Sequence, residues 1–335
     1  MSILVTGCAG FIGAHLARRL LVEGETVAGL DDFNAYYDPA LKEARVRWVQ
    51  EAGELDLHRV ALEDAAGLAA VFDAVRPSVV IHLAAQAGVR HSIEDPASYV
   101  RSNLVGFANL LECCRQHEVA HLVYASTSSV YGLSTQRPYR EDQPADHPMS
   151  FYAATKRANE AMAHSYAHLY GLPCTGLRFF TVYGPWGRPD MALFKFTRAM
   201  LTGEPIQIYN EGRLRRDWTY IDDIVEGVVR VSRAAPSPDA DWVSAPPALG
   251  SSSAPSRIFN IGADSPVELL RFIEVLEQSL GVAAVRELLP MQPGDVAATW
   301  ADVSSLEASV GYRPQVAVEQ GVPRFIEWYR EYYGV

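Results

Sequence analysis

The sequence predicts an α/β fold with a doubly wound parallel sheet, followed by a smaller α/β C-terminal domain. Short apolar runs alternate with longer helical patterns through the first half, and a glycine-rich turn follows the first run. After about residue 180 the alternation becomes irregular. Because 335 residues usually divide into two parts, we expect one domain over 1–180 and a second over 181–335, with the chain returning to the first around 215–262.

The first half supplies the strands and crossover helices in order. Runs that are apolar throughout are typical of strands buried on both faces, and they occur at 3–7, 26–30, 58–62, 78–84, 121–126 and 174–180. Helical patterns stand between them at 11–23, 41–51, 64–75, 97–116 and 152–170.

The second half predicts fewer and less regular elements. Helical patterns occur at 191–202, 221–233, 266–280 and 317–333, with short β-like pieces at 206–209 and 257–261. The stretch 235–256 is dense in Pro, Ser and Ala and has no period, so we expect an exposed, mobile excursion there.

Composition excludes several classes of protein. A formal net charge of −11 argues against a broad nucleic-acid surface. No apolar run reaches the ~18 residues that a membrane span needs. Four cysteines, two of them adjacent at Cys113 and Cys114, do not form a disulfide scaffold. We therefore expect a cytoplasmic protein with no nucleic-acid or membrane partner.

The glycine-rich turn predicts a dinucleotide site of the Rossmann type. Gly7, Gly10 and Gly13 let the backbone approach a diphosphate at a helix N-terminus, although they could merely permit a tight turn. Asp31 ends the second apolar run, where an acid accepts hydrogen bonds from the adenosine ribose, and Asp32 follows. Two acids without an adjacent arginine favour NAD over NADP.

Tyr152 and Lys156 stand four positions apart in "SFYAATKRAN" and would share one helix face. A nearby ammonium favours the phenolate and lowers the tyrosine pKa from about 10. Such a tyrosine could take a proton from a sugar hydroxyl while the carbon gives hydride to NAD⁺. The same spacing is common on ordinary helix surfaces, so the surrounding motifs decide.

Several motifs give that context. The glycine turn, "HLAAQAGVR" (82–90), "YASTSSVYG" (124–132) and "YAATK" (152–156) occur in this order and resemble the extended short-chain dehydrogenase/reductase family. "DDFNAYYD", "GLRFFTVYGPWGRPDMALFKF", "RRDWTYIDDI" and "LPMQPGDV" are similar to segments of the UDP-glucuronate 4-epimerases within it. The resemblance covers essentially the whole chain. It implies an NAD-dependent isomerase that converts UDP-glucuronate to UDP-galacturonate through a 4-keto intermediate.

The resemblance also assigns roles. Tyr152 would be the acid/base, Lys156 would lower its pKa, and Thr127 would complete the catalytic set. NAD contacts are expected at Gly7, Gly10, Phe11, Ile12, Gly13, Asp31, Asp32, Asn34, Lys42, Leu83, Ala84, Ala85, Gln86, Asn103, Ser126, Tyr152, Lys156, Phe179 and Val182. Arg216 would hold the diphosphate, Gln207 and Tyr209 the uracil, and Asp295 the uridine ribose. Relatives commonly place an Asp where this chain has Ala61, so adenine recognition is expected to rely on backbone groups or on Glu63 instead.

The residues after Thr127 bear on the reaction. Related 4,6-dehydratases carry Asp-Glu there and the decarboxylases usually carry a Glu, whereas this chain has Ser128 and Ser129. Hydroxyls are poor proton shuttles near neutral pH, so the ketone should survive until hydride returns. Arg188 is expected to clamp the substrate carboxylate, helped by Thr127, Ser128 and Thr181, in an orientation that disfavours loss of CO₂. It could instead tie down its own loop. Arg90 is a second candidate cation, at the phosphates or in a loop salt bridge.

Other functions are less favoured. Epimerisation of UDP-glucose and UDP-galactose is the main alternative, followed by UDP-glucuronate decarboxylation and a non-catalytic NAD-sensing role. "HEVAH" (117–121) matches the zinc motif H-E-x-x-H, but His121 opens a predicted strand, so we expect no metal site. By the resemblance, apolar faces of 97–116 and 152–170 would pair in a homodimer, although such faces can equally pack on the sheet.

Overall fold

The computed structural model describes residues 2–244, 248–292 and 294–335. Its main layer is a seven-stranded sheet in the order β10-β6-β5-β4-β1-β2-β3, with every neighbouring pair parallel. The strands are β1 (Ser2–Thr6), β2 (Thr26–Leu30), β3 (Asp56–His58), β4 (Val79–His82), β5 (His121–Thr127), β6 (Cys174–Phe179) and β10 (Ser256–Ile261). The prediction of a doubly wound parallel sheet is confirmed.

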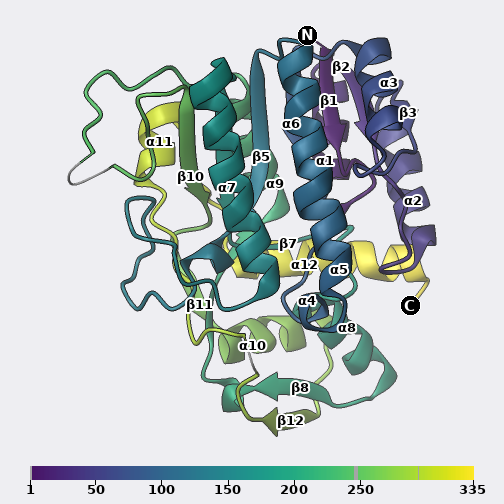
Figure 1. Ribbon diagram of the computed structural model, residues 1–335. Coiled ribbons are helices and arrows are strands. Elements are labelled where there is room, and N and C mark those ends of the chain that lie inside the picture. The colour runs from purple at the N-terminus through teal and green to yellow at the C-terminus, as the bar shows by residue number, and fades with distance from the viewer. Residues whose placement is uncertain (1, 245–247, 293) are drawn as a thin grey trace.

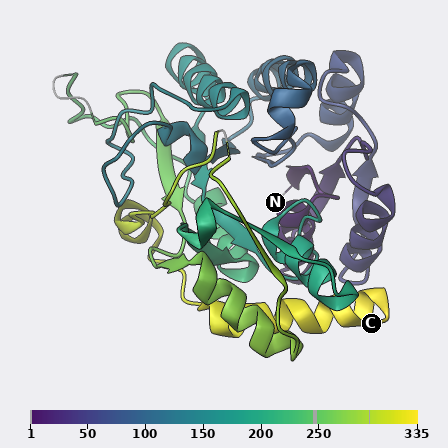
Figure 2. The ribbon, with the colours of Figure 1, turned by 90° about the horizontal axis from the view of Figure 1, so that it is seen from below.

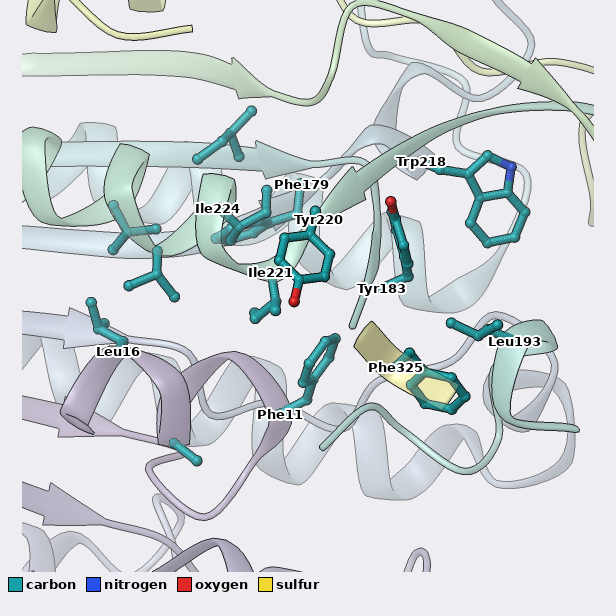
Figure 3. Packing of buried hydrophobic residues seen from close by; sticks show 14 of the residues in the cluster. Phe11, Leu16, Phe179, Tyr183, Leu193, Trp218, Tyr220, Ile221, Ile224 and Phe325 are labelled. Carbon is teal, nitrogen blue, oxygen red and sulfur yellow. The ribbon is translucent and has the colours of Figure 1, made fainter. Parts of the chain in front are cut away.

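Helices cover both faces of this sheet (Figure 1). Within β1, Ile3 and Val5 join a core with α1 and α9, whereas Leu4 joins a second core with α3, α6 and α7. Figure 3 shows Phe11 of α1 pointing toward Ile221 of α9 in the first of these cores. The covering helices are α1 (Phe11–Val22), α2 (Pro39–Gln50) and α9 (Ile221–Ser232), and α3 (Ala65–Val75), α6 (Gly106–Gln116) and α7 (Phe151–Tyr170).

A smaller region lies below the sheet in Figure 1. It contains the sheets β11-β9-β7 and β12-β8. Helix α12 runs between this region and the sheet and ends beside α2 (Figures 1 and 2). The new elements are β7 (Thr181–Tyr183), β8 (Ile206–Tyr209), β9 (Arg215–Tyr220), β11 (Pro266–Glu268), β12 (Arg286–Leu289), α8 (Ala192–Thr202), α10 (Leu269–Leu280), α11 (Ser304–Val310) and α12 (Val318–Tyr333). Within the second half of the chain, two elements return to the main sheet: α9 packs on α1, and β10 pairs with β6.

Three predicted elements were partly wrong. The strand expected at 58–62 ends at His58, and Val60 and Leu62 line a cavity instead. The helix expected from 266 begins at Leu269, because residues 266–268 pair with β9 as strand β11. The helix expected over 97–116 is α5 (Pro96–Tyr99), a π-helical turn at 100–105, and α6. In 235–256, most of the described residues are exposed, and residues 245–247 lie outside the described part.

No helix among the described residues is both long enough and apolar enough to cross a membrane.

Buried histidines, among them His15 and His121, make the stability depend on pH. Burial lowers the pKa of both His15, in α1, and His121, in β5, to about 4. A base with a lowered pKa in the folded state stabilises the fold above its unfolded pKa of about 6.5, and this contribution is lost as the pH falls toward 4. We expect each histidine to cost about 2 kcal/mol of unfolding free energy between pH 7.5 and pH 5.

Urea unfolding at these two pH values measures that loss. The double variant His15→Gln/His121→Gln should show a flatter pH dependence than the wild type. His147→Gln, at an exposed position of the loop before α7, is the control and should leave the slope unchanged. Equal slopes in all three proteins would contradict the assignment.

Candidate active site

A cavity of about 780 Å³ opens at the carboxyl ends of the parallel strands and extends to the smaller region. In the sheet, β1 lies between β4 and β2, so the strand order reverses at β1. Ligands of doubly wound sheets bind at such a reversal, and the cavity lies there. Every predicted site residue except Asn103 lines this cavity. The structure thus brings together the residues that the sequence assigned to the cofactor, the acid/base and the sugar nucleotide.

The glycine turn is closed as tightly as a diphosphate site requires. A Cβ on Gly13 would lie 2.0 Å from the Gly7 carbonyl oxygen, and one on Gly7 would lie 2.7 Å from the Ala84 nitrogen. Gly7 also has a φ of 74°, which favours glycine. Gly10 caps α1 without a side-chain bond, so the first-turn amides are available to an anion.

The acidic end of the cavity is built around Asp31. Its carboxylate accepts hydrogen bonds from the backbone of Ala9, at 3.2 Å, and of Phe33, at 2.9 Å. The Lys42 ammonium lies 3.5 Å from Asp31 and 3.8 Å from Asp32. Burial raises the pKa of Asp31, and the Lys42 charge opposes this effect. Asn34 donates to Asp32 at 2.8 Å, so the four predicted residues form one cluster.

Asn103 does not line the cavity but supports its wall. It exchanges two hydrogen bonds with the backbone of Gln86, at 2.8 and 3.0 Å, and donates to Thr155 at 3.1 Å. The π-helical turn places Asn103 at this position between the 83–86 segment and α7. The Gln86 Nε2 atom, by contrast, is buried without a partner among the described residues and borders the cavity. An unsatisfied donor fits a site that takes a polar ligand.

Tyr152 and Lys156 lie on α7 at the cavity wall, with Thr127 at the end of β5. Burial raises the pKa of Tyr152, and the Arg188 charge and a hydrogen bond with Thr127 oppose this effect. Burial also lowers the pKa of Lys156 to about 8, while Glu160 acts to raise it. The sequence predicted a lysine as the cation that favours the phenolate, whereas the structure adds Arg188 in that role.

Arg188 is held by residues that sequence reasoning missed. Its guanidinium donates to both oxygens of Asp190, at 3.0 and 2.6 Å, and the Tyr36 hydroxyl donates to the same carboxylate at 3.1 Å. Burial alone would raise the pKa of Asp190, but Arg188 and Tyr36 keep it below its usual value. Asp190 is therefore an ionised partner of the cation and is poorly suited to donate a proton.

In the part of the cavity wall that the smaller region forms, the predicted substrate-binding residues form hydrogen bonds with one another. Arg216 donates to Asp295 at 2.7 Å, and the Tyr209 hydroxyl donates to Gln207 at 2.9 Å. Arg90 lies over the Tyr209 ring, 4.8 Å from its centroid, rather than in the loop salt bridge considered from the sequence. The stack joins the 83–90 loop to β8.

A buried ion pair lies behind the acid/base residues. Glu160, two turns after Tyr152 on α7, accepts two hydrogen bonds from Arg178 of β6, both at 2.9 Å. It also accepts one from the Ser126 hydroxyl at 2.6 Å. Ser126, Glu160 and Arg178 are each at most 2% exposed. The pair therefore fixes α7 against the strand end that carries Thr127.

The "HEVAH" histidines do not converge. His117 contacts Asp73 at 3.1 Å, whereas His121 lies in β5 and contacts Thr175 at 2.9 Å. Their side chains have different neighbours on different elements, as the strand assignment of His121 predicted.

Comparison with known proteins bears on the chemistry of this cavity. Residues 3–245 match a family model described as the NAD dependent epimerase/dehydratase family. A probable UDP-glucuronate 4-epimerase of Rhizobium meliloti is 51% identical, covering 99% of this chain and 98% of that protein. UDP-glucuronate 4-epimerase 1 of Arabidopsis thaliana is 48% identical, covering 100% of this chain and 78% of that protein.

Two solved structures are similar over nearly the whole chain. The UDP-glucuronic acid 4-epimerase of Bacillus cereus, in complex with UDP-glucuronic acid and NAD, superposes with a TM-score of 0.87 at 32% identity and covers 99% of this chain and 100% of that one. The UDP-glucose 4-epimerase of Thermus thermophilus, in complex with NAD, has a TM-score of 0.83 at 31% identity and covers 98% of this chain and 99% of that one.

Proposed function

The chain belongs to the NAD dependent epimerase/dehydratase family, within the extended short-chain dehydrogenases/reductases, and from this premise we propose that it is an isomerase that interconverts UDP-glucuronate and UDP-galacturonate by inverting C4. One observation carries the proposal. At one end of the cavity, the Arg188 charge and a hydrogen bond with Thr127 both act to lower the pKa of Tyr152. The other end of the cavity is the glycine turn expected to bind a dinucleotide. We propose that NAD binds along residues of 1–180 and the UDP-sugar largely along residues of 181–335.

The residues of this chain supply proton transfer and orientation. Bound NAD supplies the hydride acceptor and donor at C4. Tyr152, as a phenolate that Thr127 and Arg188 stabilise, takes the O4 proton when C4 is oxidised and returns it when C4 is reduced. Lys156, at 1% exposure, holds a charge next to this site in a low-dielectric environment.

The same geometry keeps the 4-ketone from other reactions. Ser128 and Ser129 follow Thr127, so no carboxyl group stands there to catalyse elimination. The carboxylate that the structure does place at Arg188 is Asp190, and its ion pair keeps it ionised. We propose that a remaining edge of the Arg188 guanidinium binds the substrate carboxylate near the plane of the C4 carbonyl, an orientation in which the C5–carboxylate bond is badly aligned for loss of CO₂.

Incubation with UDP-glucuronate and separation of the nucleotide sugars tests the function. We expect UDP-galacturonate as the main product. UDP-pentose with CO₂ as the main products would show a decarboxylase. Faster turnover of UDP-glucose than of UDP-glucuronate would show a neutral-sugar epimerase.

Substitution of Arg188 tests how the acidic sugar is selected. In Arg188→Ala the substrate carboxylate loses a charge-assisted partner worth about 1.5–3 kcal/mol. We therefore expect kcat/KM for UDP-glucuronate to fall by about 10- to 100-fold, with a larger share of UDP-4-ketopentose among the products. Turnover of UDP-glucose in the same variant is the control: it loses only the effect of Arg188 on the Tyr152 phenolate and should fall by a smaller factor. An equal loss for both sugars would show that Arg188 acts through Tyr152 or its own loop and not on the substrate carboxylate.

We also propose that the protein is a homodimer formed through α6 and α7 and acts in the cytoplasm, where its four free cysteines stay reduced. Val105, at the start of this face, is 46% exposed, and Leu169 and Tyr170 of α7 are 67% and 54% exposed. Exposed apolar side chains on two adjacent helices are typical of an interface.

A charge on this face should separate the subunits. We expect Val105→Glu to shift the mass in sedimentation analysis from two chains to one, because the carboxylate would be buried unpaired at the interface. Leu288→Glu, at a 58% exposed position of β12, should remain dimeric. A wild-type monomer, or a dimeric Val105→Glu variant, would refute this interface.

A further inference from the structure

Arg45 of α2 is a fully buried cation outside the predicted site, with 0% exposure. Its Nη1 group donates to the Ala9 carbonyl at 3.2 Å and to the Tyr37 hydroxyl at 2.6 Å. Its Nε donates to the Trp186 carbonyl at 3.0 Å. Its Nη2 group donates to the carbonyls of Trp186, at 2.7 Å, and Gly187, at 3.0 Å. These bonds use all five donors of the guanidinium.

The acceptors come from two places that matter for the proposed function. Ala9 belongs to the glycine turn, where its own nitrogen donates to Asp31 at 3.2 Å. Trp186 and Gly187 come directly before Arg188. A single planar group thus spans from the cofactor-binding turn to the loop that carries the sugar-facing cation. A lysine could not reproduce this, because its compact ammonium cannot reach acceptors on both sides in the same way.

The loop that Arg45 binds, at Trp186 and Gly187, has a strained backbone and is held between two helices by aromatic contacts. Trp186 has a φ of 60°, which is unfavourable for a bulky residue and needs the surroundings to enforce it. Its ring lies 5.5 Å from that of Trp48 in α2 and 5.2 Å from that of Trp328 in α12. Figures 1 and 2 show the end of α12 beside α2. The aromatic contacts set the position of the loop, and the Arg45 bonds set the direction of its carbonyls.

The charge of Arg45 has no carboxylate partner among the residues that the structure describes. The buried Arg178 is neutralised by Glu160, but Arg45 takes part in no ion pair within the described ranges. The charge acts on neighbouring groups, since it contributes to lowering the pKa of His15 in the first turns of α1. A buried unpaired cation is costly, so its retention next to the diphosphate turn is consistent with an anion that completes its neutralisation.

We propose that Arg45 is a positioning residue that couples the dinucleotide-binding turn to the loop of Arg188, so that binding of the cofactor diphosphate orders the cation that receives the sugar carboxylate. The role assigned to Arg188 rests on the proposed function. The physical coupling between turn and loop does not, and the two can be tested separately.

Two substitutions separate the charge from the hydrogen bonds. Arg45→Lys keeps the charge, so NAD affinity should stay within about threefold of wild type, while kcat for UDP-glucuronate falls by about 10- to 100-fold, as for a misplaced catalytic geometry. Arg45→Met loses the charge as well, so NAD affinity should fall roughly tenfold. Wild-type kcat and KM in Arg45→Lys, or equal NAD affinity in both variants, would overturn the proposal. NAD affinity is measured by calorimetry and needs no sugar.

Hydrogen exchange on the unmodified full chain gives a readout that does not depend on whether the variants fold. Addition of NAD should protect the amides of 184–188 together with those of 7–13. Protection of 7–13 without any change at 184–188 would overturn the coupling. If the coupling appears but UDP-glucuronate is not converted, the proposed function fails while the link between turn and loop stands.

Discussion

Tyr152→Phe is expected to reduce kcat for UDP-glucuronate by about 10³-fold, the usual loss when a general acid/base is removed. The substitution deletes one oxygen and keeps the ring, which packs edge-on against Tyr99 with centroids 6.1 Å apart. Folding and NAD binding should therefore be retained. Without the hydroxyl, the neighbouring Thr127, Ser128 and Ser129 cannot accept the O4 proton at neutral pH, because serine and threonine hydroxyls have pKa values far above it. Product formation is followed by separating the nucleotide sugars.

Tyr99→Phe is the matched control. The Tyr99 hydroxyl donates to the Gly88 carbonyl at 2.6 Å and is committed to the loop. Its loss should cost about 1 kcal/mol of stability and reduce kcat by no more than about tenfold. Turnover by Tyr152→Phe within tenfold of wild type, or an equal loss in both variants, would show that Tyr152 is not the acid/base.

The five central strands of the sheet, β6, β5, β4, β1 and β2, could be predicted because each is a nearly continuous apolar run, as expected for a strand buried on both faces. The small strands of the second region could not be predicted in this way. β9 reads "RRDWTY" and pairs with β7 and β11, and β11 begins with a proline before a helix. Their strand state depends on partners that are distant in sequence rather than on local pattern. The shift of β3 also depends on distant partners, because Val60 and Leu62 pack with the second core and line the cavity instead of extending the strand.

At the site, sequence patterns located the residues that face the cavity but not those that hold them. Gly7, Asp31, Tyr152 and Lys156 belong to short motifs with fixed spacing. Asp190, Tyr36 and Arg45 act through contacts across the fold, for which the sequence carries no period or spacing. Asp190, two residues after Arg188, carried the one signal that could have been used, since an acid so close to a predicted clamp is a candidate partner.

The buried pair behind Tyr152 is a further feature that only the structure reveals, and breaking it should have the largest effect on stability. In Glu160→Gln, Arg178 keeps its charge at 1% exposure and loses its carboxylate. Removal of one partner of a buried ion pair costs about 3–5 kcal/mol. We expect that loss in the free energy of unfolding by urea. Because the amide offers one acceptor oxygen where the carboxylate offered two to Arg178 and Ser126, the Thr127 end of β5 should loosen and kcat of the folded fraction should fall.

Two further variants separate a buried pair from an exposed one. Arg157 contacts the same carboxylate at 3.0 Å but its side chain is 35% exposed, so Arg157→Ala should cost less than about 1 kcal/mol. Glu160→Gln/Arg178→Met removes the charge that was left unpaired and should recover part of the stability lost in Glu160→Gln. Equal stability of Glu160→Gln and Arg157→Ala would mean that the pair is already solvated. Recovery of stability in the double variant without recovery of kcat would show that the pair is retained for the placement of Thr127 and Tyr152 rather than for the fold.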